Sequence, residues 1–408
     1  MTMPLCTAPF HSVLIDTDKT VKPCCVYNKP LGDLNTTSIQ DILSNNDYVK
    51  LRQQMIDNEW PDNCVGCKKT EDATGSSLRL QLYGAHRVPY HNNTDITFLE
   101  FSSSNLCNLV CVGCSPSFSS AWQNFRNEVP WWKNFRKTQG WDYEENEGWK
   151  DRPEWKHHPS MLDFANNFLN TIDLSKLTYI SLKGGEPFLN KEIVTLLEHL
   201  DDIKVLSNIE IMITTNGTTV TDKILMLLGK AKHVIFNISI DGLGKLNQYI
   251  RFDPKNPEKS HTDEIKKNIL RFTEVKNSEI KMITSIQAHN VFRIHELSTW
   301  WKEDIYPMLI DAGKYVYYPP YYSHFIFYPR EVSVQVFSQE TRVKLIKHYE
   351  SLPSSHLYKD LIEFLRLPYL GNYHPNQFVK YTQALDKTRL DDFLDLVPEA
   401  EEEFRILN

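Results

Sequence analysis

The chain has 408 residues, a formal net charge of −7, 41% hydrophobic residues and 24% charged residues. These proportions suit a globular protein of two or three domains, and the negative charge argues against a broad nucleic-acid-binding surface. No apolar run approaches the roughly 18 residues that a membrane helix needs, and residues 1–12 lack the basic and apolar segments of a signal peptide. We therefore expect a cytoplasmic protein with neither a membrane segment nor a nucleic-acid partner.

The first expected unit spans residues 1–90. Val13–Ile15 and Val21–Pro23 lie on either side of a polar turn and predict a hairpin with a cysteine at each base. Ser38 is expected to cap a helix whose apolar stripe runs as far as Ile56.

All eight cysteines lie within the first 114 residues. This asymmetry opposes a disulfide framework spread over the fold and favours metal ligation in a reducing cytosol. Cys24 and Cys25 are adjacent, and because neighbouring residues of an extended chain point to opposite faces, only one of them is expected to ligate. Four thiols on the hairpin and after the helix could hold zinc or an iron–sulfur cluster, and their spacing alone favours zinc: Cys6, Cys24, Cys64 and Cys67.

A second unit, residues 91–310, alternates between strand-like and helix-like segments. Such alternation implies parallel strands joined by right-handed crossovers, which is an α/β fold. Strands are expected at 96–101, 177–182, 209–214, 234–240 and 281–286, with a sixth at 314–319. Helices are expected near 116–127, 161–170, 191–200, 220–230, 261–274 and 293–302.

Two segments depart from this alternation. Residues 128–160 are rich in tryptophan, and a long aromatic insertion is typical of a lid or a binding loop, although the same side chains would equally well pack the insertion onto the sheet. Residues 311–408 form a last region, in which helices are expected near 338–351, 356–366 and 376–386.

Three thiols stand close together after the strand expected at 96–101. Cys107, Cys111 and Cys114 lie on the loop that follows it. Three thiolates cannot fill four tetrahedral positions, but they suit a [4Fe–4S] cluster that keeps one iron open. A zinc site lacking one ligand, or three ordinary buried cysteines, are the alternative interpretations.

A glycine pair follows the next strand. Gly184 and Gly185 let the backbone approach a ligand closely, and Glu186 offers a carboxylate that can accept a charge-assisted hydrogen bond from an ammonium group. Taken alone, this segment is as well explained by a simple turn.

The two motifs together resemble those of the radical S-adenosylmethionine (SAM) enzymes, which carry CxxxCxxC after the first strand and GGEP after the second. The resemblance implies a partial (β/α)6 barrel of the TIM type, a catalytic [4Fe–4S] cluster on Cys107, Cys111 and Cys114, and SAM bound to its open iron. Reductive cleavage of SAM would give a 5′-deoxyadenosyl radical. Gly113 departs from the pattern, since many members have an aromatic residue before the last cysteine.

The resemblance also assigns residues to parts of SAM. The backbone of Gly184 and Gly185 and the carboxylate of Glu186 would contact its amino group. Ser239 and Asp241 would face the ribose and Arg251 the carboxylate, and the polarity of these side chains suits those groups. Asp241 followed by glycine also fits an Asx turn.

The N-terminal unit resembles the SPASM and twitch extensions of radical SAM enzymes, which bind auxiliary iron–sulfur clusters. Such extensions usually lie at the C-terminus, whereas this one comes first, and Lys19 stands where the family has glycine in the hairpin turn. Counting from that position selects Cys24 rather than Cys25. The resemblance implies one auxiliary [4Fe–4S] cluster, held by Cys6, Cys24, Cys64 and Cys67.

The expected organisation is a cluster domain at 1–90, a radical SAM core at 91–310 and a barrel-closing helical region at 311–408. Members with SPASM domains often modify peptides, so the resemblance implies a peptide or protein substrate and a flavodoxin- or ferredoxin-like electron donor. The alternatives are a small-molecule substrate such as a sugar, or a non-catalytic zinc-bearing module that binds a partner.

Overall fold

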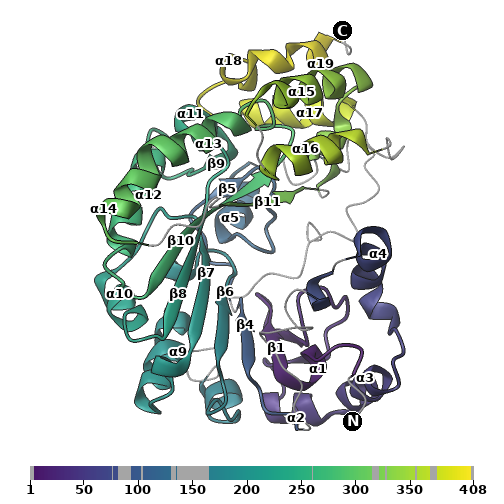
Figure 1. The fold of residues 1–408 in the computed structure, drawn as a ribbon, viewed down its shortest axis with the longest axis vertical. Helices are drawn as coiled ribbons and strands as arrows, with labels where there is room; N and C mark the ends of the chain where they lie inside the picture. The colour runs from purple at the N-terminus through teal and green to yellow at the C-terminus, as the bar shows by residue number, and fades with distance from the viewer. Residues whose placement is uncertain are drawn as a thin grey trace.

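Nine strands of the described chain form a single open sheet in the computed structural model (Figure 1). The structure describes residues 4–75, 77–80, 93–102, 104–129, 135, 165–259, 261–314, 321–326, 329–353, 356–367 and 375–405. Their order is β11-β10-β8-β7-β6-β4-β1-β2-β3, so the two end strands do not meet and the barrel is partial, as expected.

Six neighbouring strands of the sheet run parallel. The sixth strand begins after the expected range 314–319, of which all but Lys314 lies outside the described residues. The six strands are β4 (Phe98–Phe101), β6 (Tyr179–Leu182), β7 (Glu210–Thr215), β8 (His233–Ser239), β10 (Ser278–Ile286) and β11 (Tyr321–Phe325).

Helices line the outer side of this sheet (Figure 1). They confirm the expected alternation, although no helix was expected at Gly244–Ile250 or Tyr306–Asp311; the ends of the others shift by a few residues. The helices of this layer are α9 (Lys191–Asp202), α10 (Asp222–Leu228), α11 (Gly244–Ile250), α12 (His261–Phe272), α13 (Ile294–Trp300) and α14 (Tyr306–Asp311). Of the helix expected near 161–170, the described part is one π-helical turn, Ala165–Leu169.

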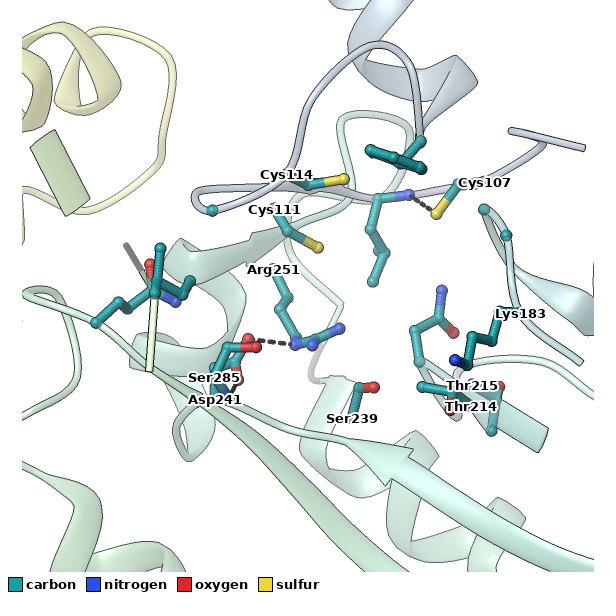
Figure 2. Close-up of a pocket in the computed structure, with 18 residues that line it drawn as sticks. Cys107, Cys111, Cys114, Lys183, Thr214, Thr215, Ser239, Asp241, Arg251 and Ser285 are labelled. Carbon is teal, nitrogen blue, oxygen red and sulfur yellow. Dashed lines mark hydrogen bonds and ion pairs between the residues drawn. The ribbon is translucent and has the colours of Figure 1, made fainter. Parts of the chain in front are cut away.

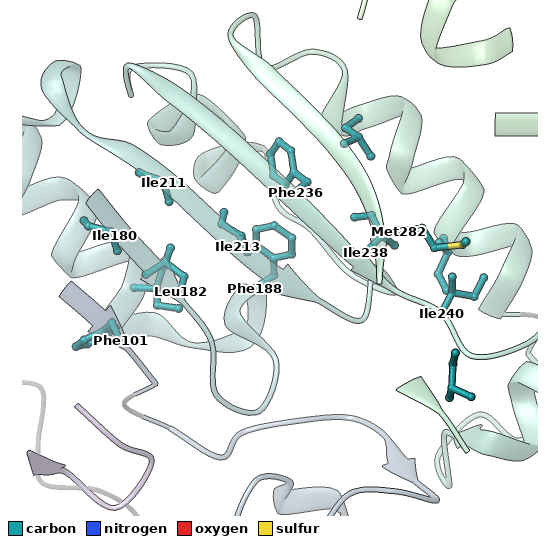
Figure 3. Close-up of a cluster of buried hydrophobic side chains, with 14 of the residues drawn as sticks. Phe101, Ile180, Leu182, Phe188, Ile211, Ile213, Phe236, Ile238, Ile240 and Met282 are labelled. Atoms are coloured by element: carbon teal, nitrogen blue, oxygen red, sulfur yellow. The ribbon is translucent and has the colours of Figure 1, made fainter. Parts of the chain in front are cut away.

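The two faces of the sheet differ in polarity because side chains alternate along each strand. Leu182, Ile213 and Phe236 are register partners on three neighbouring strands and form a buried row under the helices (Figure 3). Phe236 stacks on Phe272 of α12 with ring centroids 4.6 Å apart. The opposite face is more polar, and its side chains on β7 and β10 are only partly buried, so it can meet a polar ligand.

The N-terminal unit extends the same sheet. Strands β1 (Ser12–Ile15) and β2 (Thr20–Lys22) form the expected antiparallel hairpin, and β3 (Gly32–Asp33) pairs with β2. Strand β1 also pairs in parallel with β4, so the core sheet continues into this unit without a break.

The helix expected between Ser38 and Ile56 is two helices, α2 (Ile39–Ser44) and α3 (Asn46–Ile56). Asn45 interrupts it: its backbone is extended, and its side chain accepts a hydrogen bond from the Tyr48 N–H and caps α3. Asparagine competes for backbone donors in this way, and so the single-helix prediction was wrong. Short helices α1 (Ala8–His11) and α4 (Val65–Thr74) complete the unit.

The C-terminal region is helical, as expected, and lies at one end of the sheet (Figure 1). It comprises α15 (Gln339–Ser351), α16 (His356–Arg366), α17 (Pro375–Asp386), α18 (Phe393–Leu396) and α19 (Glu401–Arg405). Helix α5 (Ser120–Glu128) leads into the tryptophan-rich insertion, whose tryptophans lie outside the described residues. No helix among the described residues is long and apolar enough to cross a membrane.

One buried ion pair joins the N-terminal unit to the core. Lys19 adopts a left-handed conformation, with φ of 66°, at the hairpin turn. Its ammonium lies 2.5 Å from the Glu192 carboxylate in the first turn of α9, and both side chains are almost fully buried. The lysine thus accepts a backbone conformation that glycine prefers, and it neutralises a carboxylate that water cannot reach.

We predict that Lys19→Gly destabilises the protein although it relieves this backbone strain. Glycine should recover about 1–2 kcal/mol at a left-handed position, whereas a buried carboxylate without its partner costs about 3–5 kcal/mol. The expected result in urea denaturation is a net loss of about 2 kcal/mol. The double variant Lys19→Gly/Glu192→Gln should regain most of that loss. A single variant that is more stable than the parent by the full gain of about 1–2 kcal/mol would show that the ion pair contributes nothing.

Candidate functional site

A cavity of about 270 Å³ opens where the parallel strands end, and the three thiols of Cys107, Cys111 and Cys114 line it. Figure 2 shows the three sulfur atoms along one side of this cavity and Arg251 on the other. Two short strands, β5 (Val110–Cys111) and β9 (Arg251–Phe252), pair antiparallel beside it. The ladder places Arg251 opposite Cys111, so a fixed cation faces the thiol loop.

Helix α5 holds the far side of the thiol loop. Ser119 caps α5 and donates its hydroxyl to the carbonyl of Leu109 at 2.7 Å. Trp122 donates its indole N–H to the carbonyl of Cys111 at 2.8 Å, and the Cys107 N–H donates to the Ser120 hydroxyl at 3.1 Å. These bonds fix the loop backbone, so the thiols are presented in one arrangement.

The glycine pair packs against the same loop. The Gly185 N–H donates to the Ser104 carbonyl at 2.9 Å, and the Glu186 N–H donates to the Leu106 carbonyl at 2.7 Å. A Cβ atom on Gly185 would stand 2.3 Å from that Leu106 oxygen, and one on Gly184, whose φ is 104°, would stand 2.6 Å from the Ser104 oxygen. Glycine is therefore required for the approach of two backbones, and both glycines also line the cavity.

Glu186 lies behind the cavity wall. Its carboxylate accepts hydrogen bonds from the Thr215 hydroxyl at 2.7 Å, the Asn216 N–H at 2.7 Å and the Phe188 N–H at 3.1 Å. A carboxylate has about four acceptor positions, so one is not used by these bonds, although Glu186 is buried and does not itself line the cavity. Burial raises the pKa of Glu186 to about 7, and a cation beside it would lower that pKa again.

Asp241 and Arg251 form an ion pair at the cavity wall, with Nε of Arg251 2.8 Å from Oδ2 of Asp241. The other oxygen of Asp241 accepts from the Ser285 N–H at 2.8 Å. Ser239, the last residue of β8, also lines the cavity. The structure thus brings these three predicted residues together, and the Arg251 side chain extends from beside Cys111 across the cavity wall to Asp241 (Figure 2).

The space beside Gly113 is filled from another element. A Cβ atom at Gly113 would stand 2.5 Å from Cδ1 of Ile326, which follows β11. An aromatic side chain at this position would therefore displace Ile326, and this explains the departure from the family pattern. Gln287 lines the same part of the cavity, and its buried Oε1 has no hydrogen-bond donor among the described residues, so the wall has an acceptor for a ligand.

A positive charge near the thiol loop would stabilise the deprotonated thiols. Burial raises the pKa of all three thiols, that of Cys114 to about 12, while the guanidinium of Arg251 lowers the pKa of Cys111. Metal coordination deprotonates such thiols outright. The donor set and the cavity volume together fit a sulfur-ligated cluster.

A second set of thiols lines a small apolar cavity in the N-terminal unit: Cys6, Cys24, Cys64 and Cys67. Cys25 is not part of this lining. Cys25 is exposed instead. Desolvation has the largest effect on the pKa of its thiol and raises it, and the thiol is close enough to Glu100 and Lys183 for their charges to raise and lower that pKa respectively. The two adjacent cysteines therefore face different parts of the molecule. No three His, Cys, Asp or Glu side chains in the described ranges have the spacing of ligands to a single metal ion.

Asn216, at the end of β7, donates from its amide to Asn108 at 2.9 Å, which ties the thiol loop to this strand. Other residues of the site escaped the sequence analysis. Gln287 directly follows β10, and a polar residue at a strand end was the available signal. Tyr381 and Arg389 contact the thiol loop from the C-terminal region, and no local pattern marks them.

Comparison with known proteins identifies two families. A family model described as the radical SAM superfamily matches residues 101–285. The SPASM model, described as an iron–sulfur cluster-binding domain, matches residues 6–68. The SPASM match precedes the radical SAM match, in agreement with the N-terminal placement predicted from the sequence.

The solved structures that match this chain are distant. SuiB of Streptococcus suis bound to precursor peptide SuiA is 16% identical, with a TM-score of 0.34, and the match covers 67% of this chain and 52% of SuiB. Native anSMEcpe with bound AdoMet is 16% identical, with a TM-score of 0.36, and the match covers 62% and 60% of the two chains. The chain thus spans about half the length of the first of these. No curated protein matches it in sequence.

Proposed function

Because the chain belongs to the radical SAM superfamily and carries a SPASM-type iron–sulfur domain, we propose that it cleaves SAM reductively and abstracts hydrogen from a peptide or protein. The observation that carries this proposal is the cavity in which three partly buried thiols face a glycine-pair backbone and a partly buried arginine. The cofactors of this family are [4Fe–4S] clusters and SAM.

We assign the catalytic cluster to Cys107, Cys111 and Cys114. When bound there, a [4Fe–4S] cluster supplies the electron that converts SAM to methionine and a 5′-deoxyadenosyl radical. The residues around it orient SAM and exclude water. The backbone of Gly184 and Gly185 lies at the cavity wall, beside the thiol loop, where it can bind the amino end of SAM.

Side chains of suitable charge and polarity are available to bind the remaining groups of SAM. Glu186 keeps one acceptor position for the ammonium group, which would also hold this carboxyl in its ionised form. Arg251 uses Nε for Asp241, and the end of its guanidinium faces the cavity, where it can bind the SAM carboxylate. Ser239 and Asp241 are placed to face the ribose.

The auxiliary cluster is assigned to Cys6, Cys24, Cys64 and Cys67, which share one cavity. Its unit continues the core sheet through β1, so the two thiol sets have a fixed relation to each other. In this position the cluster can accept an electron from the substrate or coordinate it. A flavodoxin- or ferredoxin-like protein would supply electrons to the catalytic cluster.

The polar face of the sheet supports a peptide substrate. Lys183 lines the cavity and forms an ion pair with Glu100 at 2.8 Å. A second pair, Lys281 with Glu279 at 3.0 Å, lies farther along the same face. Charged side chains of both signs suit a peptide, which presents amide groups and charges together. The N-terminal range 1–90, the core 91–310 and the C-terminal range 311–408 would then serve as cluster domain, catalytic core and cap.

We predict that the anaerobically reconstituted protein, treated with dithionite, forms 5′-deoxyadenosine and methionine from SAM. Cys111→Ala should reduce product to the level of a blank without protein, because it removes one cluster ligand. Cys25→Ala, the matched control on a thiol outside both sets, should retain the activity. Chromatography of the products measures the outcome. A protein that carries tightly bound zinc, little iron and no SAM cleavage would instead be a partner-binding module.

We also predict that Cys24, and not Cys25, is needed for the auxiliary cluster. Two cubane clusters give about eight irons per chain, and Cys24→Ala should lower this count by up to half while SAM cleavage continues. Cys25→Ala should leave the count unchanged, because its thiol lies outside the four-thiol cavity. Iron analysis and Mössbauer spectroscopy measure both variants. If Cys25→Ala loses the cluster and Cys24→Ala keeps it, the ligand assignment is wrong.

A further inference from the structure

The C-terminal helical region, which lies outside both family matches, binds directly to the catalytic thiol loop. Tyr381 of α17 donates its hydroxyl to the carbonyl of Val112 at 3.1 Å. Arg389 donates from Nη2 to the carbonyl of Val110 at 3.0 Å. These two carbonyls belong to the residues on either side of Cys111, so the region holds the backbone around one cluster ligand.

Arg389 is the central residue of this contact. Only 8% of it is exposed. Its Nε donates to the carbonyl of Tyr249 at 3.1 Å, and its guanidinium carbon lies 4.4 Å from the ring centroid of Phe252. Val110 and Phe252 are register partners in the β5–β9 ladder. The arginine therefore spans both strands of the ladder that carries Cys111 and Arg251.

The charge of Arg389 is not neutralised by a paired carboxylate. Its three nitrogen atoms donate to two carbonyls and to the Thr388 hydroxyl, and none of the ion pairs among the described residues includes it. Asp386 acts on it only at longer range, since this carboxylate accepts from the Tyr249 hydroxyl and the Phe393 N–H. Arg251, in contrast, is paired with Asp241.

Arg389 keeps its charge although it is buried. Burial lowers the pKa of Arg389 to about 10, so the guanidinium stays protonated near neutral pH. Because it bonds to the Val110 carbonyl, directly before Cys111, this unpaired cation lies beside a proposed cluster ligand in a region that water does not screen.

We propose that Arg389 is a positioning residue that holds the Cys111 segment and sets the reduction potential of the catalytic cluster through its unpaired charge. This inference rests on the proposed function, because it takes Cys107, Cys111 and Cys114 as the cluster ligands. One-electron reduction adds one negative charge to the cluster and its thiolates. A fixed buried cation stabilises that state more than the oxidised state, and cluster potentials follow net charge and hydrogen bonding.

The test is an EPR-monitored dithionite titration of the full-length, reconstituted protein. The catalytic cluster is identified as the signal that Cys111→Ala lacks. In the neutral variants Arg389→Gln and Arg389→Met its midpoint should become more negative by at least about 59 mV, a tenfold change in a one-electron equilibrium. Arg389→Lys, which keeps the charge, should shift it less.

Two control variants remove comparable contacts but leave the charge of Arg389 in place. Arg342→Gln removes another buried arginine of the C-terminal region, which bonds to Gln335 and Leu367, and Tyr381→Phe removes the hydroxyl contact to Val112. Both should keep the parent potential. If Arg342→Gln shifts the potential as much as Arg389→Gln, the effect is a general loosening and the proposal is wrong.

The remaining outcomes also decide the question. An unchanged midpoint in both neutral variants, with the catalytic cluster present, would overturn the inference and leave the proposed function intact. Loss of the cluster from both neutral variants, with the lysine variant close to the parent potential, would support a requirement for charge. Loss of the cluster from Arg389→Lys as well would overturn the proposal, because Arg389 would then have only a structural role. A parent protein that binds no cluster at the three thiols would refute the proposed function itself.

Discussion

The site depends on a contact between two backbone segments that leaves no room for a side chain. Gly184 and Gly185 follow β6, and the chain just before Cys107 follows β4, the neighbouring strand. Two backbone hydrogen bonds join them, and a Cβ atom on either glycine would meet a carbonyl oxygen at 2.3–2.6 Å. The thiol loop therefore takes its position from β6, and the cavity wall and the thiols are parts of one rigid arrangement.

The same sheet carries the second thiol set. Strand β1 adds to β4 in parallel, and the buried Lys19–Glu192 pair fixes the hairpin to the start of α9, a few residues after the glycine pair. Of the two adjacent cysteines, Cys24 lines the four-thiol cavity, while Cys25 is under the electrostatic influence of Glu100 and Lys183. The unit that would hold the auxiliary cluster is thus built onto the wall of the catalytic cavity.

Much of this arrangement could be predicted from the sequence, because it depends on local patterns of residues. The alternation of strands and helices, the spacing of Cys107, Cys111 and Cys114 and the glycine pair each need only a few neighbouring residues. The contacts that could not be predicted join distant segments: the pairing of β1 with β4, the internal hydrogen bonds of Glu186, and the approach of Arg389 to Val110. Such contacts leave no local periodicity in the sequence. Asn45 shows that a short break in a helix is also missed by prediction when the apolar stripe continues across it.

In the proposed function the three-thiol loop leaves one iron of the cluster open for SAM. Electron–nuclear double resonance tests it on the reduced protein, frozen with SAM that carries ¹⁵N in its amino group and ¹⁷O in its carboxylate. Chelation of the open iron beside Cys107, Cys111 and Cys114 predicts strong hyperfine couplings from both nuclei. A reduced cluster that shows neither coupling, in a sample where SAM is demonstrably bound, would rule out chelation of the open iron by SAM.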